Sequence, residues 1–305
     1  VGYTVGDLDG ESNNYADVVP GSDQGLESYQ DAFLKKYGQS GQLYYTKLIG
    51  TPYQDYADDV LVDSVDCVYV VGRTTGDLNG NTNIRKEFAH WESANSGSTQ
   101  IGGIHWSDIF ISKYFDGGAH IWTKTFGTSS DEYLVGSVID SYDNLYLIGS
   151  TTGDFDDPDT NKGPDGGYFF SKFDSSGNLE WNLVNTKEGF SYSALTISDD
   201  NYIYLVSQLP DQGSTIHKYN LDGVSIWSKN IYDHFNVAQN VGFDQIEIDN
   251  DGALILFSSG SEDLLKLDIP SPLMIDENIT PANILDLVTV DQDNNESFVY
   301  QLVSG

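Results

Sequence analysis

The sequence is poor in cysteine and in basic residues. Cys67 is the only cysteine among 305 residues, so neither an intrachain disulfide nor a thiolate metal site can form. Its neighbours 68–71 are typical of a strand, which favours a buried and unreactive thiol. Lysine and arginine number 14 against 47 acidic residues, a formal charge of −33. Such a surface repels phosphate backbones and anionic lipids, which excludes nucleic acid and membrane headgroups as direct partners.

Long apolar runs are also missing from the sequence. No stretch of about 18 apolar residues occurs, so we expect no membrane-spanning helix. No signal peptide stands at Val1, and the chain opens inside what looks like a repeat, so we expect it to be part of a longer polypeptide. Hydrophobic residues make up 39% of the sequence, with 20 Tyr and 14 Phe, a composition that argues against disorder.

What the sequence does contain is internal repetition. Five segments place a lysine after an apolar, strand-like stretch and before another apolar residue: 31–37, 108–114, 167–173, 215–219 and 264–268. Three of them continue into an Asp/Gly turn and a strand that carries Trp122, Trp181 or Trp227. Tyr45 stands at the matching position of the first unit. We therefore expect these aromatic side chains to be mostly buried between neighbouring repeats.

The spacing of the repeats predicts the fold. Three pairs of residues lie 77 positions apart: Gly50 and Gly127, Asp63 and Asp140, and Gly72 and Gly149. Later units are shorter, with 59 residues from Lys113 to Lys172 and 46 from there to Lys218. Units of roughly 40–50 residues with four short strands are typical of propeller blades, which must stack to bury a core. The sequence predicts an all-β protein whose residues 1–268 form a β-propeller of four-stranded antiparallel blades, with an insertion at 78–107.

The repeat resembles a known family. The successive steps apolar-Lys-Tyr/Phe-Asp, Gly-Asn-Leu-x-Trp, Gly-Thr/Ser-x-x-Asp, Val-x-Val-Asp-Ser and Val-Tyr-Val-x-Gly-x-Thr are similar to the bacterial seven-bladed β-propeller repeat family. The likeness covers about residues 1–268 and weakens in the last two units, where 207–210 replaces the Gly-x-Thr-Thr step. About four and a half blades are visible. The resemblance implies a large secreted or cell-surface protein and attaches no catalytic residues to the repeat.

The end of the chain is different in character. Residues 275–305, after a Pro-containing linker at 269–274, resemble the opening of a bacterial cadherin-like repeat, part of a β-sandwich. In that family acidic residues bind Ca²⁺ between modules, and the matching positions here are Glu277, Asp291 and Asp293. One more propeller hairpin is an equally good interpretation, because Val-Thr-Val-Asp also fits the blade pattern.

Oxygen ligands gather after each Thr/Val-Gly step. Side chains with oxygen atoms at every second position around a glycine turn can coordinate Ca²⁺, as they do in the first half of an EF-hand loop. These loops are not EF-hands, because no Glu stands at the twelfth position. The alternative is that these side chains form Asx-turns in solvated loops. The sequence predicts calcium ligands at Asp7, Asp9, Glu11, Asp77, Asn79, Asn81, Asp154, Asp156 and Asp159.

The insertion concentrates aromatic and basic residues in an otherwise acidic protein. Arg85, His90, Trp91 and Trp106 are candidates for contact with a glycan or a protein at a cell surface. The interpretation that we favour is that the tryptophans pack the insertion itself against the propeller rim.

The sequence contains few motifs that are typical of enzymes. The five histidines lack metal-ligand spacing, and no nucleophile elbow or phosphate-binding glycine loop appears. Arg73 and Arg85 are the only arginines, too few for a sialidase-type cluster, although 47 acidic residues could hide a glycosidase pair. The sequence thus predicts a non-enzymatic extracellular scaffold or adhesion module, joined to further modules and stiffened by Ca²⁺. The alternatives are a glycan- or receptor-binding head that uses the insertion, and, third, a propeller glycosidase or lyase.

Overall fold

The computed structural model describes twelve stretches of the chain: 1–5, 7–11, 30–51, 53–78, 107–155, 167–187, 189–210, 212–232, 242–258, 263–267, 287–290 and 297–300. They divide into two units, Val1–Leu267 and Asp268–Gly305. Within the described residues strands dominate, helical backbone is confined to Ile231 and Tyr232, and no helix could cross a membrane.

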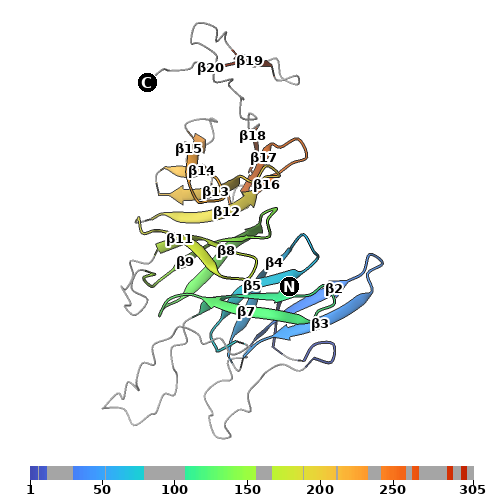
Figure 1. Cartoon of the computed structure of the whole chain (residues 1–305). Helices are drawn as coiled ribbons and strands as arrows, with labels where there is room; N and C mark the ends of the chain where they lie inside the picture. Colours follow the sequence, from blue (N-terminus) through green and yellow to red (C-terminus); the bar gives the residue numbers. More distant parts are fainter. Residues whose placement is uncertain are drawn as a thin grey trace, which may run out of the picture. The chain divides into compact units, whose positions relative to one another are not determined.

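The first unit contains eighteen strands (Figure 1). In chain order they are β1 (Gly2–Thr4), β2 (Asp31–Tyr37), β3 (Leu43–Ile49), β4 (Asp55–Val62), β5 (Val68–Thr74), β6 (Asp108–Tyr114), β7 (His120–Phe126), β8 (Glu132–Ile139), β9 (Leu145–Thr151), β10 (Gly167–Phe173), β11 (Leu179–Asn185), β12 (Ser191–Ile197), β13 (Ile203–Leu209), β14 (Gly213–Tyr219), β15 (Ser225–Asn230), β16 (Gln245–Ile248), β17 (Leu254–Ser258) and β18 (Asp263–Leu267).

These strands form consecutive antiparallel sheets. Three sheets have four strands in chain order, β4–β7, β8–β11 and β12–β15, and they are flanked by the three-stranded sheets β1–β3 and β16–β18. The first strands of successive sheets, β4, β8, β12 and β16, contact one another, as the inner strands of propeller blades do. The predicted all-β fold of four-stranded antiparallel propeller blades is confirmed.

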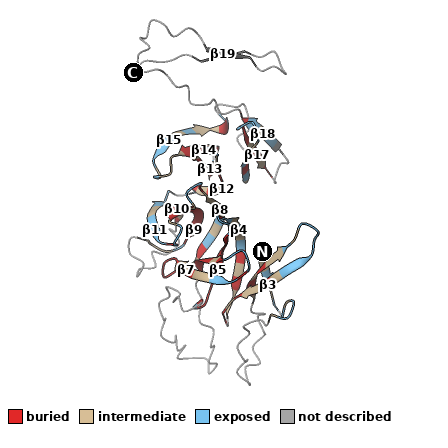
Figure 2. Ribbon diagram, turned by 45° about the vertical axis from the view of Figure 1, so that its right-hand side comes forward, coloured by how far each residue is buried: buried red, intermediate tan, exposed pale blue. Residues whose placement is uncertain are grey.

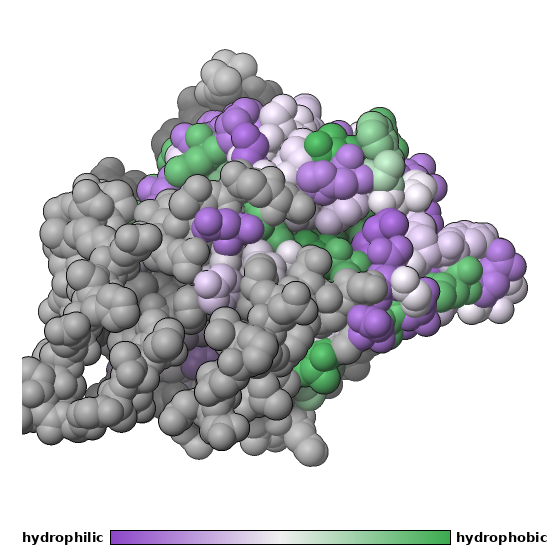
Figure 3. Space-filling view, turned by 90° about the horizontal axis from the view of Figure 1, so that it is seen from below, coloured by the Kyte–Doolittle hydropathy of each residue, from purple (hydrophilic) through white to green (hydrophobic). Residues whose placement is uncertain are grey.

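Burial follows the position of a strand in its blade (Figure 2). The second strands β5, β9 and β13 are buried along most of their length, which explains their continuous apolar sequences. The fourth strands β11 and β15 are largely exposed. Seen from below (Figure 3), the described atoms show hydrophilic and hydrophobic patches side by side.

The repeated tryptophans lie where the repeat predicts, and each is partly buried. Trp122, Trp181 and Trp227 each stand opposite the repeated lysine of the neighbouring strand. Each ring also contacts a fully or almost fully buried tyrosine of its own blade, with centroids 5.9, 6.0 and 6.1 Å apart. The fourth strand lies at the blade's outer edge, so one side of each indole stays in contact with solvent.

In the second unit the described residues form one hairpin, β19 (Leu287–Val290) paired with β20 (Ser297–Tyr300). The linker 269–274 and the predicted ligands Glu277, Asp291 and Asp293 lie outside the described residues.

Candidate functional site at the inner strands

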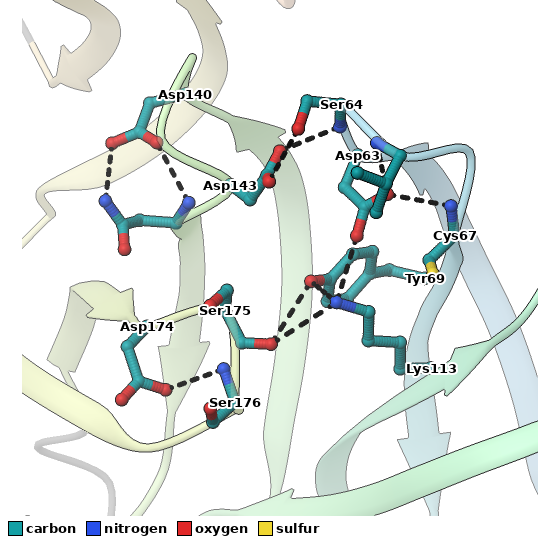
Figure 4. Close-up of polar contacts among 12 residues, drawn as sticks. Asp63, Ser64, Cys67, Tyr69, Lys113, Asp140, Asp143, Asp174, Ser175 and Ser176 are labelled. Carbon is teal, nitrogen blue, oxygen red and sulfur yellow. Dashed lines mark hydrogen bonds and ion pairs between the residues drawn. The ribbon is translucent and has the colours of Figure 1, made fainter.

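A lysine–tyrosine cluster lies at the turn end of the β4–β7 blade (Figure 4). Lys113 Nζ donates to Tyr69 Oη at 2.6 Å and lies 2.9 Å from Asp63 Oδ2. Burial opposes the charge of Lys113, but the hydrogen bonds with Tyr69 and Asp63 outweigh it and raise the pKa of the lysine. Tyr69 Oη also donates to the backbone carbonyl of Ser175 in the next blade, at 3.3 Å. The cluster therefore joins two blades.

The same cluster recurs along the chain, which identifies it as packing. Tyr146 stands opposite Lys172, and Tyr204 opposite Lys218, as Tyr69 stands opposite Lys113. Tyr146 Oη reaches the carbonyl of Leu221 in the following blade at 3.3 Å, matching the bond of Tyr69. A tyrosine–lysine pairing that three blades repeat serves the repeat, even though Lys172 forms its ion pair with Glu180 instead. A functional site is better sought where the blades differ.

A second repeated feature is a pair of buried carboxyl groups at the opposite end of the blades. Glu132 and Asp108 are both 0% exposed, and a Cβ on Gly127 would collide with an oxygen of each, so the two carboxyls flank one point. Thr128 donates to Glu132 through its backbone N–H at 2.9 Å and its hydroxyl at 2.7 Å. Burial raises the pKa of Glu132 to about 7, against these hydrogen bonds.

The preceding blade repeats this carboxyl pair. Asp55 and Asp31 are both 0% exposed, and Thr51 donates to Asp55 through its backbone N–H at 2.7 Å and its hydroxyl at 2.9 Å. Burial raises the pKa of Asp55 to about 7, and the charge of Asp31 contributes. Because both pairs are fully enclosed, a substrate outside cannot reach them.

Arg73 is the feature that the repeat does not explain. It lies near the end of β5, at the position that Tyr3 holds in β1 and Ser150 holds in β9. Arg73 Nε donates to Asp58 Oδ2 at 3.0 Å, and Asp58 is the extra residue of a β-bulge in the inner strand β4. The corresponding bulge of β8 holds Val135. Bulges are frequent beside active sites because they redirect a side chain.

Two tyrosines from neighbouring blades enclose the arginine. The guanidinium carbon lies 5.0 Å from the ring centre of Tyr56 and 5.3 Å from that of Tyr133, close enough for cation–π attraction to both. The Arg73 side chain is 26% exposed and Tyr133 is 41% exposed, so a molecule outside can reach them. Burial raises the pKa of Asp58, and Arg73 opposes that rise.

In this arrangement Arg73 can bind an anion, and Asp58 can act as a base beside it. Asp58 occupies one side of the guanidinium through Nε and, at 3.4 Å, Nη2. The other N–H groups of Arg73 make no hydrogen bond with another described residue, so they remain available for a carboxylate. The sequence analysis noted Arg73 only as one of two arginines. The available signal was its place in the repeat, where other units carry the uncharged residues tyrosine, serine or glutamine.

The predicted calcium ligands are only partly described. Asp9 accepts a hydrogen bond from Thr46 at 2.7 Å and pairs with Lys35, and Glu11 lies 3.6 Å from Lys47, so these two carboxylates face basic side chains. Asp7 and Asp77 are exposed and Asp154 is half-buried. Among the described residues, no three acidic, histidine or cysteine side chains gather closely enough to hold a metal ion. Asn79, Asn81, Asp156, Asp159, Arg85, His90, Trp91 and Trp106 lie outside the described residues.

No protein-family model and no curated protein matches the chain. Similar solved structures include a streptogramin B lyase, 14% identical with a TM-score of 0.43, covering 90% of this chain and 77% of that one. A gluconolactonase from Xanthomonas campestris is 12% identical with a TM-score of 0.40, covering 90% and 79%. A protein of unknown function from Bacteroides caccae is 6% identical with a TM-score of 0.43, covering 86% and 80%. At these identities the names assign no activity to this chain, and the cadherin-like resemblance of residues 275–305 gains no support.

The comparisons contradict the prediction of a non-enzymatic scaffold or adhesion module only to this extent: named enzymes, a lyase and a gluconolactonase, are among the propeller-like structures, so the fold gives no ground for excluding catalysis. The error was to treat missing arginine clusters and histidine motifs as evidence against catalysis. A repeat scaffold fixes the architecture, while catalytic groups can stand at any position where one blade departs from the others.

Proposed function

We propose that this chain is an enzymatic propeller of the bacterial seven-bladed repeat family that binds a carboxylated sugar at Arg73 and removes a proton from it through Asp58. The observation that carries the proposal is the Arg73–Asp58 pair, which stands between two tyrosine rings at a place where the other blades have neither charge.

Binding follows from three properties of the site. The unused N–H groups of Arg73 suit the paired oxygens of a carboxylate. The exposed ring of Tyr133 offers an apolar face to a sugar ring. A formal charge of −33 repels acidic ligands elsewhere, so a partly buried arginine between aromatic rings is the place where an anion is held.

The chemistry that this geometry supports is elimination. Arg73 neutralises the sugar carboxylate and stabilises the negative charge that develops on it. Asp58 accepts the proton from the adjacent carbon, whose C–H electrons form a C=C bond while the C–O bond at the next carbon breaks. The leaving oxygen takes a proton from water. Asp58 is a better base than an exposed aspartate because burial raises its pKa.

Calorimetry with an oligomer of glucuronic acid, and with its carboxyl-reduced neutral analogue, tests the binding step. We expect the acidic oligomer to bind and Arg73→Gln to weaken it at least tenfold. Lys187→Gln removes the same charge from an exposed lysine and should leave binding unchanged. Equal affinities for both oligomers would refute the proposal.

Ultraviolet absorbance of the unsaturated product tests the chemical step separately. We expect Asp58→Asn to abolish product formation and to retain binding of the acidic oligomer. Binding without turnover by the native protein would restrict the proposal to recognition of the anion.

Three expectations from the sequence continue as proposals. Ca²⁺ at the Asp-rich loops would stiffen the propeller, and the module would act outside the cell. Its partners would be proteins or glycans at a cell surface, or further modules of the same polypeptide. The acidic composition supports the first of these.

A further inference from the structure

A chain of hydrogen bonds crosses the β12–β15 blade through a histidine. His217 Nδ1 lies 2.8 Å from Ser228 Oγ, and His217 Nε2 lies 2.7 Å from Ser207 Oγ. The histidine is on β14, between Ser207 on β13 and Ser228 on β15. A nucleophile within hydrogen-bond reach of a base that a third group orients is the general signature of covalent catalysis.

The position of the histidine in the middle of this chain distinguishes the β12–β15 blade from the two preceding blades. At the corresponding cross-strand positions of the two preceding blades, Ser112 meets Thr123 at 2.8 Å and Ser171 meets Asn182 at 2.7 Å. In the first of these pairs His120 Nε2 also lies 2.8 Å from Thr123 Oγ1, so a histidine is present there too, at the start of β7. The β12–β15 blade differs because His217 itself stands between two serines and contacts both.

The two serines differ in exposure, which assigns their roles. Ser207 is 2% exposed and fixes the ring from inside the sheet, whereas Ser228 is exposed on the outermost strand. With the proton on Nε2 donated to Ser207, Nδ1 is free to accept from Ser228. Burial lowers the pKa of His217 to about 4, so the ring is neutral near neutral pH and one of its two nitrogens is a hydrogen-bond acceptor.

We infer that Ser228 is a nucleophile that His217 activates, with Ser207 as the positioning residue, and that this site takes small, activated carboxylic esters. Ser228 Oγ attacks the ester carbonyl, its proton passes to Nδ1 of His217, and the proton then leaves with the alcohol. Water, activated by the same histidine, hydrolyses the acyl-serine and restores the hydroxyl. The edge of β15 offers backbone N–H groups that no further strand in the described sheet occupies, and these can stabilise the oxyanion.

This site is separate from Arg73 and does not depend on the proposed elimination. A fluorophosphonate reagent tests it, because the serine oxygen displaces fluoride and forms a stable P–O bond. Mass spectrometry of the labelled peptide then compares Ser228 with Ser225, which is also exposed on β15 but has no histidine beside it. We expect Ser228 to be labelled at least tenfold faster.

Two variants extend the test. His217→Gln should reduce labelling of Ser228 to the level of Ser225, and Ser207→Ala should slow it while leaving Ser225 unchanged. The comparison of Ser228 with Ser225 in the native protein needs no variant, so it tests the inference even if a variant fails to fold. Equal labelling of both serines, or a rate at Ser228 that His217→Gln leaves unchanged, would overturn the inference.

Discussion

At the scale of single residues, the buried carboxyl pairs are the groups most sensitive to pH. Glu132 is surrounded by Thr128 and Thr151, which donate hydrogen bonds, and by Asp108 and the nearby charge of Asp131. With no basic side chain among these neighbours, the protonated form is favoured. Ionising both carboxyl groups in one enclosed space costs free energy, because the two negative charges repel each other and neither is solvated.

The first prediction is that the protein loses stability as the pH rises from about 5 to 8. The pKa of Glu132 is raised to about 7, above its unfolded value, so its stabilising contribution is complete below the unfolded pKa and disappears as the pH passes the folded one. A shift of this size corresponds to about 3 kcal/mol at most. Glu132→Gln keeps one oxygen as an acceptor for the hydroxyls of Thr128 and Thr151 and cannot ionise, so its unfolding free energy should fall less between pH 5 and pH 8 than that of the native protein.

Urea unfolding at several pH values measures this effect. Asp199→Asn removes one charge from an exposed turn and serves as the matched control, which should keep the native pH dependence. Carboxylates with lowered pKa values, such as Asp63 and Asp249, act in more acidic solutions and do not mask the result. An unchanged slope in Glu132→Gln would show that this carboxyl is ionised throughout.

At the scale of strands and blades, the repeated tryptophans illustrate how one blade supports the next. Trp181 lies 4.9 Å from the ring centre of Phe170 and 6.0 Å from that of Tyr146. Its far edge approaches Gly223 in the turn of the following blade, where a side chain would press on the indole. The fourth strand, although mostly exposed, thus contributes to the interface through one residue.

We predict that Trp181→Ala lowers the unfolding free energy by about 3 kcal/mol, the lower end of the range for a large aromatic side chain, because the indole is half-buried. Chemical denaturation with fluorescence or circular dichroism measures the loss. Tyr142→Ala, at a side chain that is 68% exposed, should change stability by less than about 0.5 kcal/mol. A loss below about 1 kcal/mol in Trp181→Ala would mean that the interface does not depend on this ring.

Local patterns predicted the blades well because each blade is a local structure. The Asp/Gly turns, the apolar second strands and the opposed lysine and tryptophan all fall within one repeat. The repeat does not reveal which strand lies outermost, so it could not indicate that Trp181 keeps some contact with solvent.

The candidate sites were harder to predict because they join residues from different strands or blades. Asp55 interacts with Asp31 across two sheets, and Arg73 contacts Tyr133 of the next blade. Aligning the units would single out Arg73 and His217 as residues that break the repeat. It would not show that Asp58 sits on a bulge facing the arginine, because the bulge is a property of the strand pairing.

At the scale of the whole molecule, part of the acidic charge serves the blade turns. Asp63, Asp174 and Asp249 each accept backbone N–H groups from the turn that comes after them, at 2.7–3.1 Å. These Asx-type turns explain why aspartate recurs at blade ends without any metal. The loop around Asp154 differs from them, because its sequence crowds further carboxylates into a short segment.

The last prediction is that millimolar Ca²⁺ raises the melting temperature of the protein and that a chelator lowers it. Mutual repulsion is strong in a chain of formal charge −33 and strongest where Asp154, Asp156 and Asp159 follow one another. An ion that binds only the folded state stabilises it by about 2.7 kcal/mol at 100 times its dissociation constant. Because general screening would also stabilise, NaCl at matched ionic strength is the control. Asp154→Asn combined with Asp156→Asn should reduce the calcium response but not the NaCl response. If both salts stabilise equally, the loop acts only through its charge, and the turn chemistry of Asp63 and Asp249 would be the better model for it.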